Sequence, residues 1–397
     1  MPIGESLSAR HLLEKLVAFP SVSSDSNLDL IQFVGTYLDG WGVPWRLSRS
    51  VDGRKANLFA TIPALSGETR RGGLVLSGHT DVVPVAEQVW TSDPFTVTER
   101  DGKLYGRGTS DMKGFCAVAL AQVPALVANP LPIPLHFALS CDEETGCQGV
   151  PSLLADLLAE GIAPRAALIG EPTLMQVVNS HKGCYVLEAL ITGVPAHSSQ
   201  PHRGASAISA AAKLIAVIER EDQAAITRQV PSSDFEPPRS SLTVAMIDGG
   251  TATNIIPGRC RLAWDLRLAP WDSAEVILGR IQAAVDTEIR PALKAQHPDA
   301  DIEIRPLATV PPLRPDQSSA LERLALTLTG NNRAIAVSYA TEAGLFQQEG
   351  MDTIVCGPGS IDQAHQPDEF IDPAQLDACA DFLGRLFDKL RGAGLSG

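Results

Sequence analysis

Residues 74–81 read Leu-Val-Leu-Ser-Gly-His-Thr-Asp, an apolar run that leads directly into an imidazole and a carboxylate. Three more short apolar runs occur at residues 135–139, 166–169 and 353–355. Continuous runs of this length are typical of strands buried on both faces, as in the parallel sheet of an α/β domain. We therefore predict an α/β catalytic domain with a mixed, mostly parallel sheet flanked by helices. Ile31, Val34 and Leu38 would mark the buried face of one such helix.

The sequence pattern changes between residues 181 and 308. A helix is expected after the first and after the third of four strands, which we place at residues 184–192, 241–247, 259–268 and 301–305. Asp272 and Glu275 resemble a capping box at the start of the later helix. The order β-α-β-β-α-β predicts a ferredoxin-like α+β lid and dimerisation domain at residues 181–308. This domain would be inserted into a catalytic domain formed by residues 1–180 and 309–397.

The composition indicates a cytoplasmic globular protein. Its 44% apolar and 20% charged residues are ordinary for that class, and a net charge of −14 argues against nucleic acid as a partner. Residues 114–141 contain no charged residue, but four prolines interrupt them, so a core helix, a turn and a buried strand are expected instead of a membrane span. Charges near the amino terminus argue against a signal peptide. Seven dispersed cysteines without a CxxC pair fit a reducing compartment.

Five short segments carry side chains that could bind divalent metal ions. Each segment alone is weak evidence, because a lone His-x-Asp, a pair of glutamates or a Gly-Glu-Pro turn is usually structural. Together they lie at strand ends or in adjoining loops of one predicted domain, where α/β sheets build their sites. The segments are Gly78–Asp81, Gly108–Gly114, Asp142–Gly146, Gly170–Pro172 and Ala364–Gln366.

The charges of these segments support a metal pair. Two Zn²⁺ ions carry four positive charges, and Asp111, Glu144 and Glu171 would supply three negative ones, with His79 and His365 as neutral nitrogen ligands. Without metal ions the carboxylates would converge with no counter-charge, which raises their pKa values. Paired divalent ions of this kind activate water for hydrolysis.

These motifs and the inserted lid resemble the two-zinc M20 metallopeptidases and deacylases over nearly the whole chain. The resemblance implies two Zn²⁺ ions, with Co²⁺ as a possible substitute. His79 and Glu171 would hold one ion, Glu144 and His365 the other, and Asp111 would bridge them through a loop with a cis bond to Met112. Asp81 is expected to orient the His79 imidazole, as such ligands generally require.

The same resemblance implies roles for five further residues. Glu143 would act as general base, and His197 in the lid would stabilise the tetrahedral oxyanion, often from the partner subunit. Arg267 would bind the substrate carboxylate and Asn254 the scissile carbonyl, although a solvated arginine and a turn residue are the simpler interpretations. Glu342 is hypothesised to pair with a substrate ammonium group, with helix capping as the alternative.

The expected activity is zinc-dependent hydrolysis of a small N-acyl amino acid, N²-acetyl-L-ornithine, to ornithine and acetate in arginine biosynthesis. Alternatives within the family are succinyl-diaminopimelate desuccinylation, hydrolysis of another N-acyl amino acid and dipeptide hydrolysis. A non-catalytic metal-dependent binding protein is the alternative from another class, which an intact Glu143 argues against. A homodimer through the lid is also expected, with no membrane partner.

Overall fold

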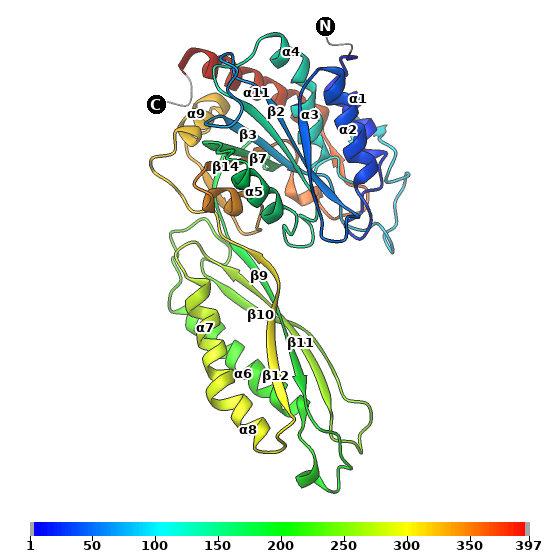
Figure 1. The fold of residues 1–397 in the computed structure, drawn as a ribbon, viewed down its shortest axis with the longest axis vertical. Helices are drawn as coiled ribbons and strands as arrows, with labels where there is room; N and C mark the ends of the chain where they lie inside the picture. The colour runs from blue at the N-terminus through cyan, green and yellow to red at the C-terminus, as the bar shows by residue number, and fades with distance from the viewer. Residues whose placement is uncertain (1–3, 394–397) are drawn as a thin grey trace. The chain divides into compact units, whose positions relative to one another are not determined.

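The computed structural model describes residues 4–393, which form two compact units (Figure 1). Unit 1 contains the described residues up to Ser180, the segment Leu313–Ile335 and the residues from Thr341 onward. Unit 2 contains His181–Pro312 and Ala336–Ala340. Each unit has its own apolar core, as is usual for a chain too long for a single one.

An eight-stranded mixed sheet runs through unit 1 in the order β1-β2-β6-β3-β7-β14-β8-β13. Its strands are β1 (Trp45–Arg49), β2 (Ala56–Ile62), β3 (Leu74–His79), β6 (Leu135–Ser140), β7 (Ala166–Pro172), β8 (Val178–His181), β13 (Ile335–Val337) and β14 (Asp352–Gly357). The neighbours β6, β3, β7 and β14 are parallel, whereas β1, β2 and β8 pair antiparallel. Every residue of β3, β6 and β7 is buried, so the predicted buried parallel strands are confirmed.

Helices cover the sheet of unit 1 on both faces. They are α1 (Ala9–Val17), α2 (Leu28–Gly40), α3 (Lys113–Ala121), α4 (Val123–Ala128), α5 (Val150–Ala159), α9 (Ala320–Thr329), α10 (Ala343–Gln348) and α11 (Pro373–Ala393). Helices α1, α2, α3, α9 and α11 share one apolar core with Leu74 and Leu76 of β3. The side chain of Val75 points to the other face, because side chains alternate along a strand. Helices α5 and α10 contact the sheet and each other outside that core.

The segment without charges folds into three core elements of unit 1. It forms α3, α4 and β6, with prolines at the start of α4 and in the turn before β6. The predicted helix, turn and buried strand are therefore confirmed. Among residues 4–393, no helix is both long and apolar enough to cross a membrane. A second, small antiparallel sheet consists of β4 (Thr98–Arg100), β5 (Lys103–Tyr105) and β15 (Phe370–Ile371).

Unit 2 is an antiparallel sheet packed against helices. Its strands are β9 (Gly183–Thr192), β10 (Ser241–Gly249), β11 (Arg259–Leu268) and β12 (Asp301–Val310), in the order β10-β11-β9-β12. Its helical segments are η1 (Pro201–Arg203), α6 (Ala207–Ile226), α7 (Ala274–Ala284), η2 (Val285–Ile289) and α8 (Arg290–Lys294). One apolar cluster joins the strands to α6 and α7. The order β9-α6-β10-β11-α7-β12 confirms the predicted ferredoxin-like arrangement.

The start of α7 differs from the predicted capping box. Ser273 is the N-cap, and its hydroxyl accepts a hydrogen bond from the Val276 backbone N–H at 3.2 Å. Asp272 instead accepts hydrogen bonds from Ser240 and, at 3.2 Å, from Arg228. These partners come from distant parts of the chain, so the local pattern placed the cap one residue too early.

Candidate metal centre

The candidate ligands of unit 1 meet at one edge of the large sheet. His79 is the last residue of β3, Glu143 and Glu144 follow β6, and Glu171 lies near the end of β7. Because these three strands are neighbours and parallel, their carboxyl ends share one edge. Asp111 precedes α3, and a cis peptide bond joins it to Met112, as expected.

His79 lies buried between two carboxylates. Its Nε2 is 3.0 Å from Oδ1 of Asp111 and 4.0 Å from Oε1 of Glu171. Its Nδ1 lies 2.8 Å from the backbone carbonyl of Asp81, which can only accept a hydrogen bond. This contact places a proton on Nδ1, so Nε2 is the nitrogen that faces the acidic cluster and could bind a cation.

Asp111 also faces the second candidate histidine. Nε2 of His365 is 3.5 Å from Oδ2 of Asp111 and 2.9 Å from Oε2 of Glu144. The two oxygens of Asp111 therefore point to different imidazoles, with Oδ1 toward His79 and Oδ2 toward His365. A carboxylate placed in this way is suited to bridge two cations.

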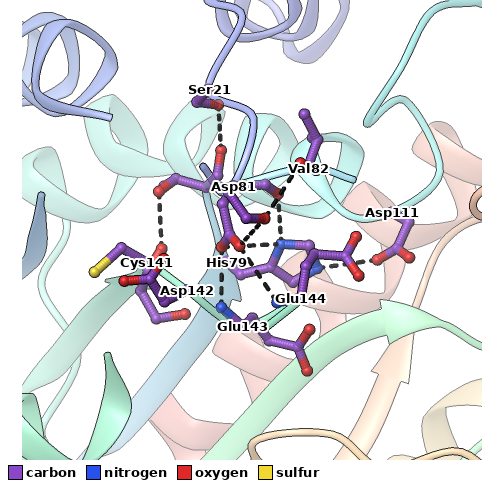
Figure 2. A network of polar contacts seen from close by, with 12 residues as sticks. Ser21, His79, Asp81, Val82, Asp111, Cys141, Asp142, Glu143 and Glu144 are labelled. Atoms are coloured by element: carbon purple, nitrogen blue, oxygen red, sulfur yellow. Dashed lines mark hydrogen bonds and ion pairs between the residues drawn. The ribbon is translucent and has the colours of Figure 1, made fainter. Parts of the chain in front are cut away.

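The Asp81 carboxylate holds the loop that carries the glutamates (Figure 2). It accepts hydrogen bonds from the backbone N–H groups of Glu143 at 3.1 Å and Glu144 at 3.3 Å, and from the hydroxyl of Ser23 at 2.7 Å. The carboxylate oxygen Oδ1 of Asp81 is 3.8 Å from Nδ1 of His79, whereas the Asp81 backbone carbonyl oxygen is only 2.8 Å from that nitrogen. Asp81 thus contacts His79 mainly through its main chain, whereas the sequence led us to expect its carboxylate.

Both the side chain and the backbone carbonyl of Glu143 are held by residues that follow it in the chain. The thiol of Cys147 lies 3.3 Å from Oε1 of Glu143, and the N–H groups of Gly146 and Cys147 donate to the Glu143 carbonyl at 2.9 and 2.8 Å. Asp142 and Cys147 both have positive φ, 57° and 54°, an uncommon conformation for residues other than glycine. Such local strain is often found at functional sites.

The three buried glutamates of the cluster resist ionisation, whereas hydrogen bonds from His365 and His79 outweigh burial and lower the pKa of Asp111. Burial and the neighbouring carboxylates Glu144 and Asp111 raise the pKa of Glu143 to about 8. Burial, followed by the charge of Asp111, also raises the pKa values of Glu144 and Glu171. Hydrogen bonds to Asp111 and Glu144 raise the pKa of His365 to about 10. Without a bound cation, Glu143, Glu144, Glu171 and His365 therefore retain protons that exposed side chains of the same kind would release at lower pH.

The donor set fits divalent metal ions. The possible ligand atoms form two groups, and within each group all atoms lie within 4.8 Å of one another. One group contains His79, Glu143 and Glu171, and the other contains His79, Asp111 and Glu144. Oε1 of Glu171 is buried and has no hydrogen-bond partner among the described residues. A buried, unpaired carboxylate oxygen costs free energy that a bound cation would offset.

Two residues around this cluster were not predicted from the sequence. Glu369 is buried and accepts hydrogen bonds from the backbone N–H groups of Ser110 at 2.8 Å and Asp111 at 3.1 Å. Arg107, also buried, donates to Glu369 at 2.8 Å. Glu369 follows His365 by only four residues, but no local pattern distinguishes it from a surface carboxylate.

Glu342 does not lie at the surface of the site. Its side chain is fully buried, and its two oxygens accept hydrogen bonds from the hydroxyls of Ser77 and, at 2.8 Å, Ser140. Its side chain does not cap α10 either. A substrate ammonium group has no open path to a carboxylate enclosed in this way, so the structure gives the hypothesised substrate contact no support.

The remaining candidates belong to unit 2. His197 and Asn254 are both exposed, and they lie on two segments that pair with each other. The Ser198 N–H donates to the Asn254 carbonyl at 2.9 Å, and His197 forms an isolated antiparallel β-bridge with Ile255. Arg267 lies on β11, and its Nε donates to Asp265 at 3.0 Å. The structure brings His197 and Asn254 together, with Arg267 elsewhere in the same unit.

This fold and site define a class of hydrolase. The chain belongs to peptidase family M20/M25/M40, whose family model matches residues 75–389. An acetylornithine deacetylase of Yersinia pseudotuberculosis is 36% identical over 385 residues, which cover 95% of this chain and 96% of that protein. The expected family and enzyme class are thereby confirmed.

Solved structures share the fold. The M20 family metallo-carboxypeptidase of Sulfolobus solfataricus has a TM-score of 0.73 at 17% identity, covering 96% of this chain and 99% of its own. A dinuclear metal binding peptidase of the M20 family from Bacillus subtilis has a TM-score of 0.63 at 14% identity, covering 96% and 97% of the two chains. The expected fold class is confirmed.

Proposed function

We propose that this protein is a two-metal amidohydrolase that releases acetate from N²-acetyl-L-ornithine. The observation that carries the proposal is the position of Asp111, whose two oxygens face His79 at 3.0 Å and His365 at 3.5 Å amid converging carboxylates. The substrate is proposed because a relative of 36% identity over almost the whole chain is named acetylornithine deacetylase.

The ligands divide into two sets that share Asp111. His79 and Glu171 would hold one ion, and Glu144 and His365 the other, with Zn²⁺ as the proposed metal and Co²⁺ as a substitute. When bound, such ions lower the pKa of water and polarise the amide carbonyl. The orphaned Glu171 oxygen and the raised pKa values of the cluster support this assignment.

Glu143 is the proposed general base. Its carboxylate would take a proton from the attacking water and pass it to the leaving amine of the substrate. The Cys147 thiol donates to Oε1 of Glu143 at 3.3 Å and holds that oxygen in place. Oε2 is then the oxygen directed to the water.

The residues of unit 2 are proposed to bind substrate. His197 would donate to the developing oxyanion, and Asn254, on the segment paired with it, to the same carbonyl group. Arg267 would bind the α-carboxylate, a task suited to a planar guanidinium. We also propose a cytoplasmic homodimer formed through unit 2, with the residues 181–308 acting as the lid.

A substrate panel tests this proposal. The zinc-loaded protein is assayed on acetylornithine, succinyl-diaminopimelate, acetylmethionine and a dipeptide, with and without chelator. We expect the highest kcat/KM for acetylornithine, and loss of acetate release with chelator. Preference for another amide would overturn the substrate but keep the reaction class. Release from none of the four would favour a non-catalytic binding protein.

A further inference from the structure

The two candidate histidines are held very differently. His79 ends a central strand and its side chain is 1% exposed. The His365 side chain is 53% exposed, and the residue lies in a loop after η3 (Ile361–Gln363) with φ of +64°. Packing fixes His79, but the direction of the His365 imidazole depends on how its main chain is held.

Hydrogen bonds hold that main chain in place. Nε2 of Gln88 donates to the His365 carbonyl at 2.9 Å. Nη2 of Arg107 donates to Oε1 of Gln88 at 2.6 Å, and Nη1 lies 3.3 Å from the Gln366 carbonyl. Arg107 thus supports the His365 loop both directly and through Gln88.

The same arginine connects to the loop that carries Asp111. Its partner Glu369 accepts from the backbone N–H of Gly108 at 3.0 Å, Ser110 at 2.8 Å and Asp111 at 3.1 Å. Both charged side chains are almost completely buried, at 1% and 0% exposure. Glu369 belongs to the His365 loop but binds the main chain of the Asp111 loop, so the pair joins two ligand-bearing loops.

We propose that the buried Arg107–Glu369 pair is a positioning device that sets the distance between Asp111 and His365. By setting this distance, the pair controls how tightly the ion held by Asp111, Glu144 and His365 is bound. The inference rests on the metal centre proposed above. The other ion shares Asp111 but takes His79 and Glu171 from strands that need no such support, so the ion that also depends on His365 is affected more.

A purely structural ion pair would behave differently. Removing one partner of a buried pair destabilises the fold wherever it lies. It would not separate the affinities of two metal ions. The number of tightly bound ions per folded chain therefore distinguishes positioning from general stabilisation.

The test compares three variants with the unaltered protein. Glu369→Gln removes the carboxylate. Gln88→Ala removes the support of the His365 carbonyl, together with the Gln88 contacts to Arg107 and Trp90, at a half-buried position and leaves the Arg107–Glu369 pair in place. Glu188→Gln is the matched control, because Glu188 is also a buried carboxylate paired with arginines, Arg261 and Arg305, but belongs to unit 2. Zinc stoichiometry and affinity are measured by chelator competition, and Co²⁺ absorption reports each site.

We expect the unaltered protein and Glu188→Gln to bind two ions tightly. Gln88→Ala should keep one tight ion and bind the other about 10- to 100-fold more weakly, the range for residues that orient metal ligands. Glu369→Gln should weaken the ion held by His365 by a similar factor and the other ion by less, because both ions share Asp111. If Glu369→Gln does not fold, the zinc stoichiometry and affinity of Gln88→Ala alone test the inference. Two ions bound with unchanged affinity in the folded variants, or an equal weakening of both, would overturn the inference. An unaltered protein that binds no ion would instead overturn the proposed function.

Discussion

Nε2 of His79 lies 3.0 Å from Oδ1 of Asp111, although the two residues are 32 positions apart in the chain. The contact joins the end of a central strand to the loop before α3. It brings an imidazole from a strand and a carboxylate from a loop together in the candidate metal centre. The proposed chemistry depends on this contact.

Replacing the proposed general base should stop turnover without releasing metal. Glu143→Gln keeps the shape of the side chain but cannot accept the proton, so we expect kcat to fall by about 10²- to 10⁴-fold. Metal content, measured by atomic emission, should stay at that of the unaltered protein. Glu160→Gln, at an exposed position after α5, is the control and should keep full activity. Near-normal kcat in Glu143→Gln would exclude this residue as the base.

Metal removal should change how stability depends on pH. In the metal-free fold, burial raises the pKa of Glu143 from 4.5 to about 8. Between these values the folded state holds a proton that the unfolded chain releases, so rising pH favours unfolding by up to about 1.4 kcal/mol per pH unit for this proton. Denaturant unfolding of chelator-treated and zinc-loaded protein at pH 5 to 8 measures the slope. The slope should be steep only without metal, and equal slopes would count against the metal cluster.

His136 provides a pH effect away from the candidate ligands. It lies within β6, where Thr61 contacts its Nδ1 at 3.0 Å, and burial lowers its pKa from 6.5 to about 4. Above pH 6.5, His136 is neutral in both the folded and the unfolded chain, and the window that matters runs from pH 6.5 down to about 4. As pH falls through this window the unfolded chain gains a proton that the folded state refuses, so stability is lost, by roughly 3 kcal/mol at 1.4 kcal/mol per unit.

Chelator-treated His136→Gln should therefore lose less stability than the unaltered protein between pH 6.5 and 4. His202→Gln, at an exposed position in η1, serves as the control and should keep the original slope. Chemical unfolding curves at four pH values would show the difference. Parallel curves for all three proteins would mean that His136 does not contribute to the acid sensitivity.

Gly170 should not tolerate a side chain. A Cβ atom there would lie 1.9 Å from the ring of Phe115, a buried core residue of α3, so the strand carrying Glu171 would have to move. We expect Gly170→Ala to lose at least about 1–3 kcal/mol of stability and to bind metal more weakly. Gly279→Ala, within α7 and with open space around the position, should gain about 0.5–1 kcal/mol. Thermal unfolding and metal titration would measure both, and a fully stable Gly170→Ala with normal metal binding would contradict the packing argument.

The fold and the cluster could be predicted because their signals are local. Leu74 to Leu76 form an apolar run followed by His79, and Glu171 follows a run of the same kind. Parallel neighbouring strands bring such ends to one edge, so their position after the apolar runs was enough to group these residues. Their assignment to individual ions came from the family resemblance.

The features that sequence did not reveal depend on distant partners. Glu342 is buried because Ser77 and Ser140, 265 and 202 positions away, bind its carboxylate. Glu369 holds the Asp111 loop from 258 positions away. Asp272 does not cap α7 because Arg228 and Ser240 bind it, leaving the cap to its neighbour. No local pattern identifies such pairs before the chain has folded.

The most direct test is anomalous diffraction from crystals of the zinc-loaded protein. The account predicts two peaks on opposite sides of Asp111, one in contact with His79 and Glu171 and the other with Glu144 and His365. A single peak that contacts neither histidine, or no peak at this edge of the sheet, would contradict it.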